Sequence, residues 1–136
     1  MTSWIVPCNP EKYDIKGALQ KLIQIDWHQK ASSIETGDIV YIYVSKPYQK
    51  ILFQCVVVKT NMDDYEIDDR KFVKDGAQFL NEGPYMRVHL VKKLDECDID
   101  LKALRIQGLE GNIQGPRRVD GELLEYIEKT IDANMC

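Results

Sequence analysis

The sequence predicts a single α+β domain in which a curved, barrel-like β-sheet is flanked by short helices. Three observations lead to this fold class. The chain has 136 residues, the usual size of one domain. Several runs alternate or are rich in β-branched residues, as strands are, and others have the three- and four-residue apolar spacing of helices. No internal repeat or low-complexity linker divides the chain, so residues 1–136 are predicted to fold together.

The N-terminal part predicts a strand followed by a helix. An apolar stretch ends near Pro7, because proline removes a backbone donor and is unfavourable inside a central strand. Asp14 is suited to cap a helix whose apolar residues recur every three or four positions. This helix is expected to end near Ile25, which leaves Trp27 and His28 in a connection.

A β-hairpin is predicted next. Residues 39–44, IVYIYV, form the strongest strand pattern in the sequence. Because strand side chains alternate, Tyr41 and Tyr43 lie on one face, aliphatic residues lie on the other, and both faces are expected to be buried. Residues 51–59, ILFQCVVVK, are dense in β-branched residues and predict the antiparallel partner.

The C-terminal part predicts two strands and two helices. Residues 85–94 alternate between an apolar and a wetter face, as a half-exposed strand does. Residues 101–107 predict a short helix that ends at Gly108. After a glycine-rich turn, residues 117–119 are expected to be extended, and Asp120 is suited to cap a last helix.

The composition excludes disorder, collagen and a membrane span. Against 18 Lys and Arg the chain has 22 Asp and Glu, a net charge of -4, and this balance argues against indiscriminate nucleic-acid binding. Six of the 22 acidic residues lie close together in residues 63–75, which we interpret as a solvated loop or insertion at the edge of the domain. No long apolar run and no signal peptide is recognisable, so we expect a cytoplasmic protein without membrane contact.

The residues that usually carry catalysis or bind metals have no recognisable pattern. The four cysteines are 47, 42 and 39 positions apart, so no CxxC pair exists. Without an export signal we expect reduced thiols. The common nucleophile, phosphate-loop and metalloprotease motifs are missing as well. We therefore expect no metal, no cofactor and no enzymatic activity.

Aromatic and hydrogen-bonding residues instead gather at the ends of predicted elements. Asn9 follows the first strand, Trp27 follows the helix, and Tyr43, Ser45 and Lys46 lie at the end of the central strand. Residues of these types, with an aromatic wall and a few polar groups, are the components of a recognition pocket.

Four motifs, in this order along nearly the whole chain, resemble an EVE domain. They are Trp4-Ile5-Val6-Pro7-Cys8-Asn9-Pro10, Trp27 after the helix, the strand start Gly37-Asp38-Ile39-Val40-Tyr41-Ile42-Tyr43, and Gly115-Pro116-Arg117-Arg118-Val119 before the last helix. The resemblance implies a PUA-like fold, related to YTH and ASCH domains. It also implies a protein that reads a modified base flipped out of nucleic acid, in systems where a partner nuclease is often attached. Asn9 replaces the usual acidic residue before proline, and the motif around Trp27 lacks its arginine.

A flipped base offers two faces and a hydrogen-bonding edge, so its reader needs apolar or aromatic walls and a few placed polar groups. Trp27 and Tyr43 are the predicted walls, and Asn9, Ser45 and His28 are the predicted edge readers. Phosphate contacts must offset the cost of flipping. The available cations are Lys46, Lys50, Arg117 and Arg118.

The sequence thus favours a non-catalytic module that binds a modified cytosine, in DNA rather than RNA. Two other functions stay open: an enzyme that acts on nucleotides or RNA, and an interaction subunit of a partner nuclease that uses an apolar stripe or residues 63–75. The oligomeric state is open as well.

Overall fold

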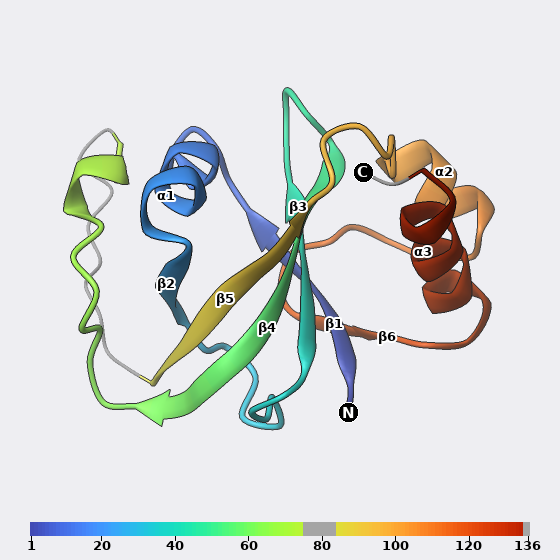
Figure 1. Ribbon diagram of the computed structural model, residues 1–136. Coiled ribbons are helices and arrows are strands. Elements are labelled where there is room, and N and C mark those ends of the chain that lie inside the picture. The colour runs from blue at the N-terminus through green and yellow to red at the C-terminus, as the bar shows by residue number, and fades with distance from the viewer. Residues whose placement is uncertain (75–83, 135–136) are drawn as a thin grey trace.

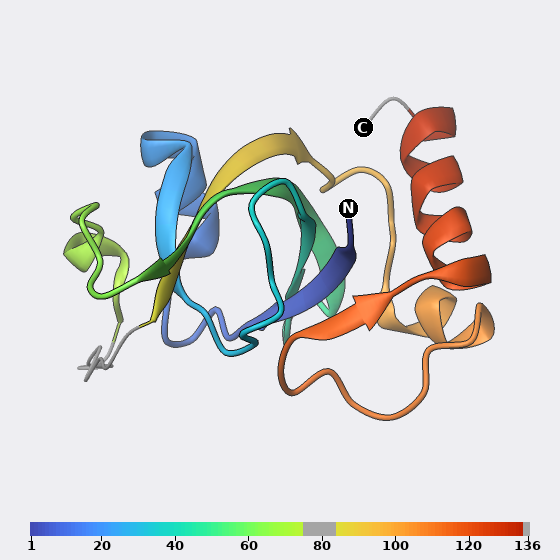
Figure 2. The same cartoon turned by 90° about the horizontal axis from the view of Figure 1, so that it is seen from below.

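The computed structural model describes residues 1–74 and 84–134, which form a six-stranded mixed sheet with three α-helices. The sheet curls into a half-barrel (Figures 1 and 2). Its strand order is β2-β5-β4-β3-β1-β6, and β1 and β3 are parallel. The elements in chain order are β1 (Ser3–Cys8), α1 (Ile15–Leu22), β2 (Gln24–His28), β3 (Ile39–Val44), β4 (Lys50–Met62), the 3-10 helix η1 (Arg70–Phe72), β5 (Tyr85–Lys93), α2 (Leu101–Ile106), β6 (Arg117–Val119) and α3 (Gly121–Asn134). The predicted fold class is confirmed.

Two hydrophobic cores lie on the two faces of the sheet. Val40, Ile42 and Val44 of β3 pack on the α1 side, whereas Tyr41 and Tyr43 pack on the side of α2 and α3. Figure 1 shows α1 and the α2/α3 pair on opposite sides of the sheet. This arrangement confirms that both faces of β3 are buried, and the antiparallel hairpin of β3 with β4 is confirmed as well.

The first strand ends near Pro7, as predicted, but it lies inside the sheet, where its proline was not expected to allow it. β1 lies between β3 and β6 and continues past Pro7 to Cys8. The short strand β6 pairs only with Ser3, Trp4 and Ile5. Pro7 is tolerated because β6 does not extend to it, so no strand on the β6 side needs a hydrogen bond from the Pro7 nitrogen.

The expected connection around Trp27 is a strand, which corrects the sequence interpretation. α1 begins after Asp14, whose carboxylate caps the Gly17 backbone nitrogen at 3.1 Å, as predicted. It ends early, at Leu22, because the next residue, Ile23, has a φ of 65°. Ile25 then pairs with Val88 of β5 and is fully buried. Burial of an isoleucine in the sheet therefore outweighs the helical spacing that extended to Ile25.

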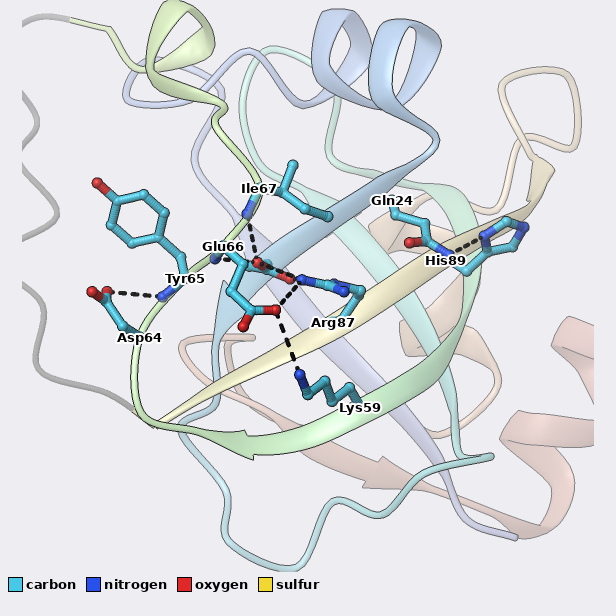
Figure 3. Close-up of polar contacts among 9 residues, drawn as sticks. Gln24, Lys59, Asp64, Tyr65, Glu66, Ile67, Arg87 and His89 are labelled. Carbon is cyan, nitrogen blue, oxygen red and sulfur yellow. Dashed lines mark hydrogen bonds and ion pairs between the residues drawn. The ribbon is translucent and has the colours of Figure 1, made fainter.

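The acidic segment is attached to the domain and is not simply solvated. Residue 75 lies outside the described residues. The backbone nitrogens of Glu66 and Ile67 donate to the buried Asp26 carboxylate at 2.7 and 2.9 Å (Figure 3). Further along, the Tyr13 hydroxyl donates to buried Asp69 at 2.6 Å. An acidic segment can dock in this way because backbone N–H groups and a phenol satisfy the buried carboxylates.

The remaining predicted elements are confirmed, with one correction among the cysteines. The helices expected around residues 101–107 and after residue 120 are α2 and α3, and residues 117–119 form β6. Cys8 and Cys55 are free, buried thiols. Cys97 is disulfide-bonded, so the expectation of reduced thiols is wrong there. In residues 1–74 and 84–134, no helix has the length and apolar character needed to cross a membrane.

Candidate functional site

A cleft of about 410 Å³ lies between the ends of β1 and β3 and the helix α2. Four residues that the sequence pattern singled out line it together: Asn9, Tyr43, Ser45 and Lys46. The parallel pairing of β1 with β3 explains their proximity. Cys8 pairs with Val44, so both strands end at the same edge of the sheet and the residues that follow lie side by side.

Backbone hydrogen bonds hold this corner of the cleft. The Ser45 backbone nitrogen donates to the Cys8 carbonyl at 3.0 Å, and the Ser45 hydroxyl reaches the same oxygen at 3.4 Å. The Asn9 Oδ1 accepts from the Glu11 backbone nitrogen at 2.9 Å, which is the local turn expected of Asn. The amide NH₂ group of Asn9 donates to no described residue and is available to a ligand.

Tyr43 lines the cleft in a different way from the one the sequence predicted. It is 5% exposed and belongs to the core beneath α2 and α3, so it cannot offer a ring face on which a base would stack. Burial raises the pKa of its phenol, and the positive charge of Arg105 partly offsets this effect. Tyr43 therefore supplies the cleft with the edge of a protonated phenol.

The opposite wall of the cleft contains residues that the sequence reasoning missed. Arg105 of α2 and Asn112 of the glycine-rich segment line it together with Leu101 and Ile113. The Arg105 Nη2 donates to Asn112 Oδ1 at 3.2 Å. The backbone of Leu101 donates to the Gln49 carbonyl at 2.9 Å, which attaches α2 to the β3–β4 loop. Leu101 and Arg105 are four positions apart, a spacing that places both on one face of a helix.

Trp27 and His28 do not join this cleft. Trp27 packs against the core on the α1 side, and its ring lies edge-on to Tyr13 with centroids 5.2 Å apart. The His28 ring lies 5.9 Å from the ring of Tyr85. Both residues belong to β2, and the strands β5 and β4 lie between β2 and β3 in the sheet. Tyr43 also lies on the other face of the sheet. The prediction that Trp27 and Tyr43 together form the walls of one pocket is therefore wrong.

We expect Trp27→Ala to lower the free energy of unfolding by about 2 to 3 kcal/mol, because it removes a large side chain packed on the core. Urea denaturation measures this loss. Ligand affinity at the Asn9 cleft should stay within twofold of wild type. A variant that kept full stability and lost ligand binding would instead assign Trp27 to the ligand site.

The three further predicted phosphate contacts lie outside the cleft. The Lys50 Nζ is 2.6 Å from the Asp98 carboxylate, so its charge is already paired. Arg117 and Arg118 line a second cleft of about 420 Å³, which they share with Glu110, Asp120 and Glu122. Three carboxylates beside two guanidinium groups make that cleft unfavourable for phosphate.

Side chains suited to covalent or metal chemistry are not grouped in the described part of the chain. Burial raises the pKa of the Cys8 thiol, despite nearby Lys74, and that of the Cys55 thiol, in each case to about 12. Both thiols are therefore protonated near neutral pH. Among residues 1–74 and 84–134, no three His, Cys, Asp or Glu side chains gather as metal ligands would.

The fold is similar to several solved structures. No family model and no curated protein matches the sequence. A crystal structure of a Pseudomonas putida protein has a TM-score of 0.66 at 17% identity and covers 94% of this chain and 98% of that one. A hypothetical protein from Leishmania major has a TM-score of 0.66 at 16% identity over 100% and 98% of the two chains. The ASCH protein from Zymomonas mobilis has a TM-score of 0.61 at 9% identity over 94% of each chain.

Identities this low show the fold and do not identify a ligand, and the EVE resemblance itself stays a prediction. The architecture is nevertheless specific, because the similarity extends over nearly the full length of each chain. The chain therefore shares its fold with the ASCH protein from Zymomonas mobilis and with the other two solved structures.

Proposed function

We propose that the protein is a non-catalytic nucleic-acid-binding module that accepts one modified base, flipped out of its strand, in the cleft between β1, β3 and α2. The observation that carries the proposal is the meeting of Asn9, Tyr43, Ser45 and Lys46 in one cleft. The volume of about 410 Å³ lies within the range of sites that hold small ligands. Similarity to an ASCH protein and the resemblance to base readers support the same class of ligand.

The lining of the cleft suits the chemistry of a base. Leu101 and Ile113 provide apolar surface for the ring faces, and Asn9, Ser45 and Gln49 provide hydrogen bonds for its edge. A flipped base needs both kinds of contact. Because Tyr43 is buried, the ring lies against aliphatic side chains in this proposal, and the Tyr43 hydroxyl contacts the edge.

Within this class we propose a modified cytosine in DNA. Glu11 lines the cleft next to Asn9. A carboxylate accepts a hydrogen bond from the exocyclic amino group of cytosine, and this is the usual side-chain pairing for that base. Thymine and uracil present an oxygen at the same position, which a carboxylate would repel. Glu11 therefore favours cytosine among the pyrimidines.

A non-catalytic role is part of the proposal. It rests on the lack of a recognisable catalytic motif in the sequence and on the protonated state of the thiols at Cys8 and Cys55. An enzyme would change its substrate, so the mass of each oligonucleotide after long incubation with the protein distinguishes the two functions. An unchanged mass supports a reader, and a changed mass rejects the non-catalytic role.

The first experiment is equilibrium binding to matched oligonucleotides. The panel contains unmodified oligonucleotides and oligonucleotides with 5-methylcytosine, 5-hydroxymethylcytosine or N6-methyladenine. Each is tested as DNA and as RNA, in single-stranded and double-stranded form, at two salt concentrations. We expect one modified-cytosine DNA to bind at least about tenfold more tightly than its parent, a difference of about 1.4 kcal/mol. Equal, weak binding of every member would reject base recognition.

Glu11→Gln should reduce the preference for cytosine over thymine in the same oligonucleotide by about tenfold, which is within the usual value of one base contact. An amide presents an NH₂ group that pairs with the thymine oxygen, so the ratio of affinities, and not the overall affinity, is the measured quantity. Glu110→Gln removes the same charge in the second cleft and is the control. Equal ratios in the two variants would exclude Glu11 from base recognition.

A further inference from the structure

We propose that Arg105 binds a phosphate group of the ligand, so that the cleft takes a nucleotide and not a base alone. This inference rests on the proposed function, since it concerns the same cleft. It replaces the phosphate contacts predicted at Lys50, Arg117 and Arg118, none of which lines that cleft.

Positive charge that is not paired with a carboxylate lies in the cleft. Arg105 and Lys46 line the cleft, Arg105 on the wall formed by α2 and Lys46 on the β3–β4 loop. Neither is in an ion pair with a carboxylate of the described residues. Lys50, the next cation along the loop, is paired with Asp98. The cleft thus retains two positive charges against the single carboxylate of Glu11, which favours an anion.

The guanidinium group of Arg105 is oriented by a neutral partner. A neutral amide oxygen, Asn112 Oδ1, accepts from Arg105 Nη2 at 3.2 Å. This bond restrains the side chain without neutralising its charge. The guanidinium has five N–H donors in a planar fork, so most of them stay available, and the fork matches two oxygens of a phosphate.

Arg105 also lies close to the side chain that we propose contacts the base edge. Its charge acts on the Tyr43 phenol across the cleft, because it lowers a pKa that burial raises. Arg105 and Tyr43 also line the same cleft, so the guanidinium is near the group that we propose contacts the base edge. A base and its own phosphate are close together in the same way, which allows one nucleotide to reach both residues.

The test compares two small probes, 5-methyl-2′-deoxycytidine and its 5′-monophosphate, by isothermal calorimetry. Wild type should bind the monophosphate at least tenfold more tightly than the nucleoside. Arg105→Gln should reduce this ratio to less than threefold, while nucleoside affinity stays within twofold of wild type. Arg105→Lys keeps the positive charge but loses the planar guanidinium that binds two phosphate oxygens. Its affinity ratio should therefore lie between those of wild type and Arg105→Gln. Lys102→Gln, an exposed cation of α2 that does not line the cleft, is the matched control and should retain the full ratio.

The outcomes separate this inference from the proposed function. If neither probe binds and no member of the oligonucleotide panel binds, both proposals fail. If the two probes bind equally, or if Arg105→Gln keeps the wild-type ratio, the phosphate assignment is overturned and base recognition stands. If Arg105→Gln is unfolded by circular dichroism, Asn112→Ala provides the second test. Loss of the orienting amide should then lower the ratio at least threefold, and an unchanged ratio overturns the assignment.

Discussion

Replacing Asp38 by alanine is expected to lower the free energy of unfolding by about 4 kcal/mol. Asp38 is 2% exposed. Its carboxylate accepts from the Thr2 nitrogen at 3.0 Å, the Trp4 Nε1 at 2.9 Å and the Glu35 nitrogen at 3.0 Å. Each donor left unpaired in a protein interior costs about 1 to 3 kcal/mol, and the three bonds connect the N-terminus, β1 and the turn before β3. Urea denaturation of the variant measures the loss.

The same carboxylate makes stability depend on pH. Burial by itself would raise the pKa of Asp38, but the hydrogen bonds from Thr2, Glu35 and Trp4 outweigh it and hold the pKa below its usual value. A lowered pKa in the folded state means that the contribution is complete above the unfolded value, about 3.9. The contribution is lost as the pH falls through the folded value. Asp38→Ala should therefore lose less stability between pH 5 and pH 2 than wild type does.

Two control variants define the result. Asp38→Asn retains one acceptor oxygen and should lose less stability than Asp38→Ala. Asp63→Ala removes an exposed carboxylate and should change the free energy of unfolding by less than about 0.5 kcal/mol. Similar losses in Asp38→Ala and Asp63→Ala would show that the three hydrogen bonds do not stabilise the fold.

Replacing Arg87 by alanine is expected to have the second large effect, lowering the free energy of unfolding by about 3 kcal/mol. The Arg87 Nε and Nη2 donate to Asp26 at 2.8 and 3.2 Å (Figure 3). The Asp26 side chain is 1% exposed. Removing one partner of a buried ion pair leaves an uncompensated charge, which usually costs about 3 to 5 kcal/mol. The backbone nitrogens of Glu66 and Ile67 continue to bind Asp26, so we expect the lower end of that range.

Glu66 provides an internal control for this prediction. Its carboxylate accepts from the same Arg87 Nη2 at 2.9 Å, yet the side chain is 59% exposed. Exposed ion pairs contribute little, so Glu66→Ala should cost less than about 1 kcal/mol. In a double-mutant cycle, Asp26→Ala combined with Arg87→Ala should lose less than the sum of the two single variants. Additive losses would contradict a direct pair.

Much of the fold follows from local patterns along the chain. The alternation in residues 39–44 correctly assigned each side chain of β3 to a face, because a strand buried on both sides has few alternatives. The cap at Asp14 was also predictable, since a short polar side chain before an apolar stripe has one common use. The assignment failed around Trp27, where helical spacing and strand pairing compete for the same residues.

The candidate site was predictable in part. Asn9, Ser45 and Lys46 are polar residues at strand ends, and parallel pairing of β1 with β3 places them together. Arg105 and Asn112 had no recognisable signal, because a basic residue near a helix end and an asparagine among glycines are common everywhere. Only the packing of α2 against the sheet places these two residues across the cleft from Ser45.

By itself, then, the sequence determined the fold class, the central hairpin and the polar residues at the ends of its strands. These features depend on residues that are close together in the chain, and the spacing of apolar residues among them can be recognised in the sequence. The tertiary structure decided which face of the sheet Trp27 covers, where the acidic segment docks, and which cations remain unpaired. Those properties depend on contacts between residues far apart in the chain, such as Asp26 with Arg87 and Lys50 with Asp98.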